Sequence, residues 1–264
     1  MDTVSVIISN YNRADLLIRA VKSVLVQSHP VLEILVCDDG STDDSKEKIK
    51  SLNEPKVKWI DCGRNGRPAI PRNHGIKNSK GNWLAFLDND DEWFPSKIEK
   101  QLSSANKLNV KAVCTNANRV RVEEDTALFF TSKDAFYSFE QMLESNQVIC
   151  SSMFFHKDLI RQISGFPEEE KFRAIEDYAL WLRIAYLEKI SFLSEPLLNY
   201  FDDAANSIRK EDVNHFTQRK LILNNLKIWT RNVKNDSPKL KLISDAINKN
   251  NVQRLKYNIK KLIS

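Results

Sequence analysis

The chain has 264 residues, 42% of them hydrophobic, so it can bury a full core and is not a disordered protein. Cys37, Cys62, Cys114 and Cys150 lie far apart without a CxxC pair, and the histidines are equally scattered, which argues against a disulfide framework or a zinc site. No apolar run approaches the ~20 residues that cross a bilayer, and no signal-peptide pattern opens the chain. We therefore expect a protein of the reducing cytoplasm.

The formal net charge of +5 is unevenly distributed along the chain. From Arg209 to the end there are fourteen Lys or Arg against four Asp or Glu, a net charge of +10, and the preceding residues carry −5. Two interpretations remain open for this basic tail: solvated helix faces, or a surface for anionic lipid or an acidic partner.

Strands and helices alternate over the first hundred residues. Continuous apolar runs predict strands at 4–8, 33–37, 57–60 and 82–87. The spacing of apolar residues and the turn signals predict helices at 13–27, 41–52 and 72–80, with Ser41 or Thr42 as a cap. This alternation predicts an α/β fold, a mostly parallel sheet with helices on both faces.

Beyond residue 100 the pattern is less regular. We predict strands at 111–122, 126–132 and 151–156, a short helix at 157–164 closed by Gly165, and a helix at 176–188. After residues 190–201 the chain becomes helical and basic, with an apolar stripe of Val252, Leu255, Ile259 and Leu262. We interpret residues 1–100 and 101–208 as two halves of one domain. The first half is expected to bind a ligand at its strand ends, and the second half to bind the substrate. Residues 209–264 are expected to form a helical C-terminal appendage.

Polar side chains follow three of the predicted strands. Residues 9–12 (SNYN) follow the first strand, 38–43 (DDGSTD) the second, and 88–91 (DNDD) the fourth. Each segment alone fits a turn, because Asp, Asn, Gly and Ser are ordinary turn residues. Ligands of open parallel sheets bind at the carboxyl ends of the strands, so three such segments together favour a binding site.

The type of ligand follows from the motifs that are absent. Neither G-x-G-x-x-G nor G-x-x-x-x-G-K occurs, so no glycine-rich loop is available to hold phosphate. Aspartates can instead hold Mg²⁺ or Mn²⁺, which in turn grips phosphate oxygens. Arg64, Arg67 and Arg72 add positive charge in the segment 63–75.

The motifs resemble, in order, those of the family 2 glycosyltransferases with the GT-A nucleotide-sugar-binding fold. The similar segments are VSVIISNYNR (opening strand), EILVCDDGSTD (nucleotide loop), PRNHGI, FLDNDDEW (the metal-binding DXD motif) and IEDYALWLRI (the region of the catalytic base). They cover roughly residues 3–200. The resemblance implies a Rossmann-like sheet flanked by helices, here followed by the basic appendage.

Residue roles are implied by the same resemblance. Ser9 and Tyr11 are expected to contact the nucleotide, with Arg72 nearby, and Asp39 to accept a hydrogen bond from the ring N–H of the nucleobase. Asp88 is expected to bind the ribose and Asp90 to hold the divalent metal. Asp177 is expected to act as the general base, with Glu176 the weaker candidate. Three alternatives stay open: Tyr11 as a packed aromatic, Arg72 in a surface ion pair, and Glu176–Asp177 as an ordinary acidic helix start.

One segment departs from the family pattern. Many members carry a histidine after the last core strand, whereas this chain reads NYFDDAANS there. Either Asp202 or Asp203 replaces it, or no residue does.

These implications predict an inverting transfer of sugar from a nucleotide-sugar, with uridine diphosphate as the expected nucleotide, to a glycan hydroxyl. The expected acceptor is a polyprenyl-diphosphate-linked glycan of capsule or O-antigen synthesis, reached by peripheral contact of the basic tail with the inner face of the cytoplasmic membrane. No nucleic-acid partner is expected. Two rival classes remain, a metal-dependent nucleotidyltransferase and a non-catalytic nucleotide-sugar-binding protein.

Overall fold

The computed structural model describes residues 2–121, 126–131, 133–202, 214–233 and 236–263. In these residues ten strands form one sheet. They are β1 (Val4–Asn10), β2 (Glu33–Asp38), β3 (Val57–Asp61), β4 (Trp83–Asp88), β5 (Glu92–Trp93), β6 (Ala112–Val120), β7 (Ala127–Leu128), β8 (Ala135–Tyr137), β9 (Phe154–His156) and β10 (Ile190–Phe201).

The sheet is parallel at one end and mixed at the other. Its main order is β3-β2-β1-β4-β9-β6-β10-β5, with β7 beside β6 and β8 beside β10. The first four strands pair in parallel, as predicted, and β6 pairs in parallel with β10. The short strand β9 runs antiparallel to both β4 and β6 and so joins the two parts.

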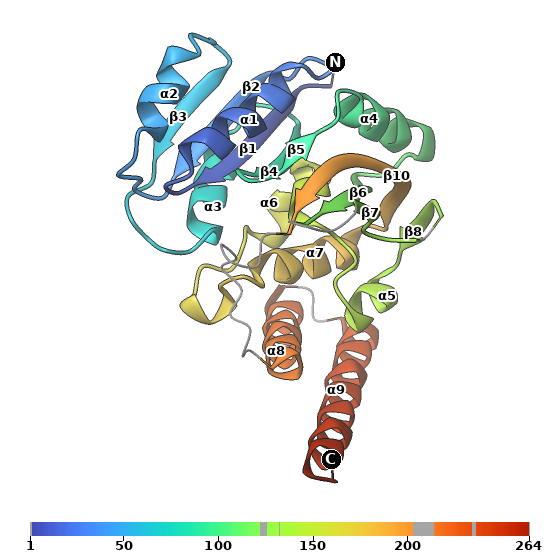
Figure 1. The fold of residues 1–264 in the computed structure, drawn as a ribbon. Coiled ribbons are helices and arrows are strands. Elements are labelled where there is room, and N and C mark those ends of the chain that lie inside the picture. Colours follow the sequence, from blue (N-terminus) through green and yellow to red (C-terminus); the bar gives the residue numbers. More distant parts are fainter. Residues whose placement is uncertain (1, 122–125, 132, 203–213, 234–235, 264) are drawn as a thin grey trace.

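Helices cover both faces of the sheet (Figure 1). They are α1 (Ala14–Leu25), α2 (Ser45–Ser51), α3 (Ala69–Asn78), α4 (Lys97–Leu108), α5 (Phe139–Glu144), α6 (Ile160–Ile163), α7 (Glu176–Leu187), α8 (His215–Val233) and α9 (Ser237–Ile263), with 3₁₀ turns η1 (Cys150–Ser152), η2 (Lys157–Leu159) and η3 (Glu170–Phe172).

The alternation of side chains along the strands produces two cores. Val6 and Ile8 of β1 pack with the apolar faces of α1 and α4, whereas Ile7 between them packs with α3 and α7. The result is a three-layer α/β/α arrangement in which the strand ends stay open to ligand.

Several local predictions were wrong. Helix α2 begins after Asp44 without a side-chain cap, because the Ser41 hydroxyl bonds to Asp38 instead. The left-handed residue that follows α6 is Ser164, with φ of 63°, and not Gly165. Among the described residues of the segments predicted as strands at 126–132 and 151–156, only those of the short strands β7 and β9 are in strands.

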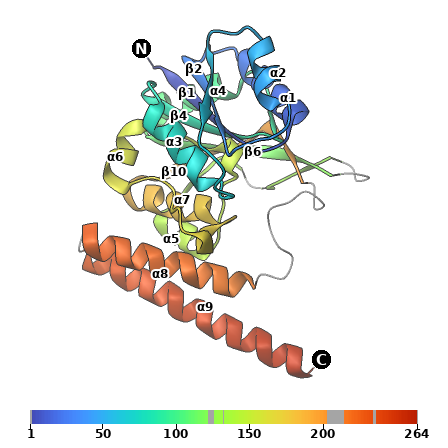
Figure 2. The same ribbon diagram turned by 90° about the vertical axis from the view of Figure 1, so that its left-hand side faces the viewer.

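The C-terminal helices α8 and α9 run side by side next to α5 and α7 (Figure 2). Leu223 and Leu226 of α8 are buried in the same core as Trp181 of α7. In the described part of the chain no helix is both long enough and apolar enough to span a bilayer. Val252 and Leu255 of the predicted stripe are exposed, and the side chains of Ile259 and Leu262 lie outside the described residues.

Candidate active site

The ends of β1, β2 and β4 meet at one cavity of about 430 Å³. These strands are neighbours in the sheet, so the three polar segments that follow them lie close together, as the sequence predicts. The residues proposed for nucleotide, metal and base all line this cavity: Ser9, Tyr11, Asp39, Arg72, Asp88, Asp90 and Asp177. Their individual roles remain predictions.

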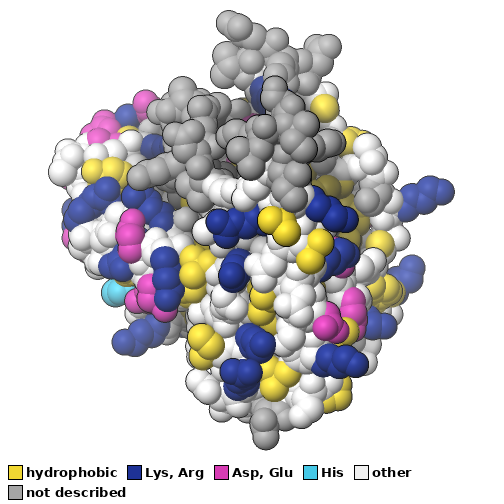
Figure 3. Space-filling view, turned by 90° about the horizontal axis from the view of Figure 1, so that it is seen from below, with side chains coloured by type: hydrophobic (Ala, Val, Ile, Leu, Met, Phe, Trp, Pro, Cys, Tyr) yellow, Lys and Arg dark blue, Asp and Glu magenta, His cyan; other side chains and the backbone are white. Residues whose placement is uncertain are grey.

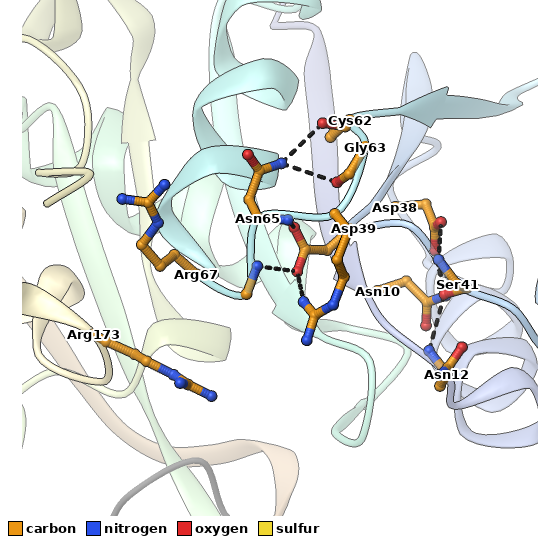
Figure 4. Close-up of polar contacts among 12 residues, drawn as sticks. Asn10, Asn12, Asp38, Asp39, Ser41, Cys62, Gly63, Asn65, Arg67 and Arg173 are labelled. Carbon is orange, nitrogen blue, oxygen red and sulfur yellow. Dashed lines mark hydrogen bonds and ion pairs between the residues drawn. The ribbon is translucent and has the colours of Figure 1, made fainter. Parts of the chain in front are cut away.

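The β1 and β2 ends are locked together by hydrogen bonds (Figure 4). Asn10 Nδ2 donates to Asp38 Oδ1 at 2.9 Å, and the Ser41 hydroxyl donates to the same oxygen at 2.5 Å. The backbone N–H of Asn12 donates to Ser41 Oγ at 2.9 Å. Asp38 is buried and holds the loop together, which leaves Asp39 as the carboxylate of this loop that lines the cavity.

Asp39 is surrounded by the segment that follows β3. Its carboxylate accepts from the backbone N–H of Asn65 at 2.9 Å and of Gly66 at 2.8 Å, and it pairs with Arg64. The close approach requires glycine at position 40, because φ is 76° there and a Cβ would lie 2.9 Å from the backbone nitrogen of Arg64. The Arg64 guanidinium also lies 3.7 Å from the ring centroid of Tyr11. In this conformation Arg64 contacts both residues that were predicted to contact the base.

Arg72 connects the two halves of the cavity. Its guanidinium donates to Asp88 Oδ1 at 2.7 Å and to Glu176 Oε1 at 2.6 Å. Arg72 and Glu176 are both buried, so the proposal of a surface ion pair for Arg72 is wrong. Glu176 is held by Arg72, and the next residue, Asp177, lines the cavity in the first turn of α7.

Asp90 is the acidic residue of the 88–91 segment that pairs with Arg13. Burial raises the pKa of the Asp90 carboxyl, the charge of Asp88 raises it further, and Arg13 partly offsets both effects. A cation placed beside Asp90 would favour its ionised form in the same way as Arg13 does. Arg13 was not singled out by the sequence, although it directly follows the SNYN segment.

The two other residues of this segment are structural. Asp91 is fully buried and accepts from the Ser151 hydroxyl at 2.5 Å and from the backbone N–H of Phe201 at 3.0 Å. Asn89 Nδ2 donates to Asn10 Oδ1 at 2.7 Å and so links the end of β4 to the end of β1. Together they fix the end of β4 against β1, η1 and β10.

Comparison with known proteins identifies the family. Residues 5–162 match the model described as Glycosyl transferase family 2. The chain is also 33% identical, over 187 residues, to the Escherichia coli protein named UDP-Glc:alpha-D-GlcNAc-diphosphoundecaprenol beta-1,3-glucosyltransferase WfaP, covering 70% of each chain. The chain belongs to glycosyl transferase family 2.

Other similarities agree with this family 2 assignment. The chain is 29% identical, over 191 residues, to Escherichia coli WfgD, whose name states the same activity, covering 72% of this chain and 73% of WfgD. It is 34% identical, over 197 residues, to an uncharacterized glycosyltransferase of Rickettsia felis, covering 74% of this chain but only 32% of that longer protein. The Staphylococcus aureus TarS 1–349 structure with UDP-GlcNAc superimposes with a TM-score of 0.75 at 18% identity, covering 93% of this chain and 72% of that one. The predicted GT-A fold is thereby confirmed.

The carboxylates of this cavity would hold a divalent metal only if the donor supplied further oxygen ligands. Among the described residues no group of three or more His, Cys, Asp or Glu could by itself hold an ion. Mg²⁺ is commonly held by one or two carboxylates plus substrate phosphates, which matches Asp90 facing a cavity large enough for a nucleotide.

The segment where family members carry a histidine holds Asp202 at the cavity wall. Asp202 accepts from Arg119 at 2.8 Å and from Arg121 at 2.9 Å, so it is bound to β6 and its following residue. Asp203, the other residue considered as a replacement, lies outside the described residues. Arg173 is a cavity residue that sequence reasoning missed, because it lies in an irregular loop without a motif of its own.

Proposed function

We propose that this protein is an inverting glycosyltransferase that moves a sugar from a UDP-sugar to a hydroxyl of a polyprenyl-diphosphate-linked glycan. The observation that carries the proposal is the convergence of Tyr11, Asp39, Asp90 and Asp177 on one cavity in a family 2 fold. The activities that the names of WfaP and WfgD state supply the substrate classes, and make UDP-glucose and a GlcNAc-diphosphate lipid the first pair to test.

In the proposed mechanism, Asp177 accepts the proton of the acceptor hydroxyl as that oxygen attacks the anomeric carbon of the donor. The bond between the anomeric carbon and the diphosphate oxygen breaks, UDP leaves, and the single displacement inverts the anomeric centre. A divalent metal on Asp90 would neutralise charge on the departing diphosphate. Tyr11 and Asp39 orient the nucleobase of the donor, and Asp88 orients its ribose.

The buried contacts around Asp177 support its role as the base. Arg72 neutralises the neighbouring Glu176, so one carboxylate of the pair is engaged in structure. Asp177 Oδ1 accepts from the backbone N–H of Tyr178 at 2.7 Å, and this contact within the first turn of α7 limits the positions that its side chain can adopt.

The decisive experiment incubates the purified protein with Mn²⁺ or Mg²⁺, a panel of UDP-sugars and a synthetic GlcNAc-diphosphate lipid, and identifies products by mass spectrometry. UDP release together with a glycosylated acceptor supports the proposal. Pyrophosphate release would instead indicate a nucleotidyltransferase. Binding of UDP without turnover of any donor would favour a non-catalytic nucleotide-sugar-binding protein.

The same proposal includes a membrane contact: the surface formed by α8 and α9 binds anionic lipid at the inner face of the cytoplasmic membrane. Val252, Leu255 and Tyr257 of α9 are about half exposed, with relative accessibilities of 53%, 61% and 49%, and Arg254 and Lys256 lie between them in the sequence. Figure 3 shows the molecule from below, the side on which α8 and α9 lie in Figure 1, and Lys and Arg side chains are mixed with apolar ones there. Such a mixture suits a helix that rests in the headgroup layer.

Substitution tests this surface better than truncation does, because removal of α8 would also expose Leu223 and Leu226. The double variant Val252→Asn, Leu255→Asn should pellet less with vesicles containing anionic lipid than the wild type does. Vesicles of neutral lipid are the control. If the variant pellets equally, and the wild type forms a concentration-dependent dimer that the variant does not form, the surface is a contact between copies of the chain.

A further inference from the structure

The cavity contains more positive charge than the proposed donor site uses. Among the described residues, five arginines line it: Arg13, Arg64, Arg67, Arg72 and Arg173. The first, second and fourth form ion pairs with carboxylates that belong to the proposed donor site. Arg67 and Arg173 have no such partner within that site.

Both of these arginines lie near the carboxylate of Glu170, at the long end of the ion-pair range. Arg67 Nε is 3.9 Å from Glu170 Oε2, and Arg173 Nη1 is 3.7 Å from Glu170 Oε1. The Glu170 side chain is 69% exposed. Two guanidinium groups thus share one loosely held surface carboxylate, which a more highly charged anion could displace.

Arg67 is positioned but incompletely bonded. Its Nη1 donates to the backbone carbonyl of Glu168 at 2.8 Å, which fixes the direction of the side chain. Its Nε is buried and has no hydrogen-bond partner in the described part of the chain. A buried N–H without an acceptor costs free energy, and an anion bound at this wall of the cavity would remove that cost.

Arg173 is held by a strained backbone. The next residue, Ala174, also lines the cavity and has φ of 68°, a left-handed conformation that is energetically unfavourable for a non-glycine residue. The preceding residue, Phe172, is buried in the core and anchors the segment. Figure 4 shows Arg67 and Arg173 on the same side of the Asp39 loop, although they come from segments far apart in the sequence.

Two anions could bind to Arg67 and Arg173, the diphosphate of the donor and the diphosphate of the acceptor, and the location of Arg173 distinguishes between them. Guanidinium forks suit the oxygens of phosphate. The donor diphosphate is proposed to lie at Asp90, beyond the end of β4, whereas Arg173 lies four residues before the proposed general base Asp177, and both line the cavity. In an acceptor such as GlcNAc-diphosphate lipid, the reacting hydroxyl and the diphosphate are attached to the same sugar ring. When that hydroxyl faces the general base Asp177, the diphosphate therefore lies across the width of one sugar ring from Asp177.

From this geometry we infer that Arg67 and Arg173 form a subsite for the diphosphate of the lipid-linked acceptor. The inference rests on the proposed function. It assigns to these two arginines the discrimination between a sugar linked to diphosphate and a sugar without diphosphate. When the acceptor binds, its phosphate oxygens take the place of the Glu170 carboxylate beside the two guanidinium groups.

Two acceptors test the subsite, with UDP-glucose as donor: GlcNAc linked through diphosphate to a short lipid, and GlcNAc linked directly to the same lipid. The wild type should prefer the first. Arg67→Gln and Arg173→Gln should each reduce the ratio of the two kcat/KM values by about 10- to 100-fold, the value of lost charge-assisted hydrogen bonds. Lys171→Gln is the matched control, since Lys171 is exposed in the same loop but does not line the cavity.

Other outcomes overturn the inference in distinguishable ways. An unchanged ratio in both arginine variants removes the subsite and leaves the proposed function intact. A rise in the KM of the donor with an unchanged ratio assigns the two arginines to the donor diphosphate. Inactivity of the wild type with every donor and acceptor removes the proposed function and the subsite together.

Discussion

Arg72 and Glu176 form a buried ion pair of 2.6 Å that joins α3 to the first turn of α7. Arg72 also reaches Asp88 at the end of β4, so one guanidinium connects the proposed ribose contact with the helix that carries the proposed base. We therefore expect the position of Asp177 relative to the donor to depend on Arg72.

Removal of Glu176 should be costly because it leaves the buried Arg72 with one partner fewer. Glu176→Ala is expected to lower the free energy of unfolding by about 3–5 kcal/mol, and Glu176→Gln by less, since the amide keeps an acceptor oxygen. Urea denaturation measures both. The exposed pair Lys100–Glu195 is the control, and Glu195→Ala should cost about 1 kcal/mol or less. Equal losses for Glu176→Ala and Glu195→Ala would contradict the structural role of the buried pair.

Asp177→Asn should separate chemistry from donor binding. The amide cannot accept the proton of the acceptor hydroxyl, so kcat is expected to fall by about 10²- to 10⁴-fold. The Kd for UDP, measured by calorimetry, should stay near that of the wild type, because the substitution preserves side-chain size. Transfer at the wild-type rate would exclude Asp177 as the base and would direct attention to Glu176.

Asp90→Ala should weaken both metal dependence and donor affinity, because the metal is expected to bind Asp90 and the donor together. The pKa of Asp90 is raised by burial and by Asp88. Protonation therefore competes with metal at a higher pH than for an ordinary carboxyl, and metal affinity should fall as the pH is lowered through this raised pKa. Titration of Mn²⁺ in the presence of UDP at several pH values measures the effect. The same metal affinity in Asp90→Ala would disprove the assignment.

The strand-end part of the site could be predicted from the sequence because it depends on parallel strands. Continuous apolar runs at β1, β2 and β4 identify buried neighbouring strands, and their carboxyl ends necessarily share one edge. Five of the seven proposed residues lie at or just beyond those strand ends, whereas Arg72 lies in α3 and Asp177 in α7 and both were proposed from the family resemblance alone. The second half of the sheet could not be predicted in the same way, since β9 pairs with β4 and β6 across long sequence separations that no local pattern encodes.

Two further features were missed for physical reasons. Helix α4 was not predicted, because Lys97 and Gln101 are buried on the same side as Ile98 and Leu102 and interrupt the apolar pattern. Arg173 acquires its place in the cavity from the backbone of Ala174, and a left-handed alanine has no sequence signature.

Lys97 makes stability depend on pH. Burial lowers the pKa of Lys97 well below its usual value, and the Nζ atom lies 2.8 Å from Gln101 Oε1 and 3.9 Å from the Trp93 ring centroid. Between the lowered pKa and 10.5 the unfolded chain binds a proton that the native state does not. The free energy of unfolding should therefore rise with pH, by up to about 1.4 kcal/mol per unit from this residue.

Lys97→Met removes this proton-binding site. Urea denaturation between pH 7.5 and 9.5 should show the wild type gaining stability relative to the variant as the pH rises. Other titrating groups, including tyrosines with raised pKa values, are common to both proteins and largely cancel in the difference. Parallel pH profiles would show that Lys97 keeps the same protonation state over this range.

Arg64 should compete with the nucleobase, because it pairs with Asp39 and covers the ring of Tyr11. Its side chain is 49% exposed, and an exposed ion pair and cation–π contact together contribute about 0.7–2 kcal/mol. If uracil must displace both contacts, Arg64→Ala should tighten binding of UDP by about 3- to 30-fold.

Calorimetry with two ligands determines where Arg64 acts. Competition at the base predicts the same gain for uridine as for UDP, since both carry uracil. Lys56→Ala, which removes an exposed charge before β3, should leave both affinities unchanged. Weaker binding of UDP to Arg64→Ala, with uridine unaffected, would instead show that Arg64 swings away from Asp39 to contact the diphosphate.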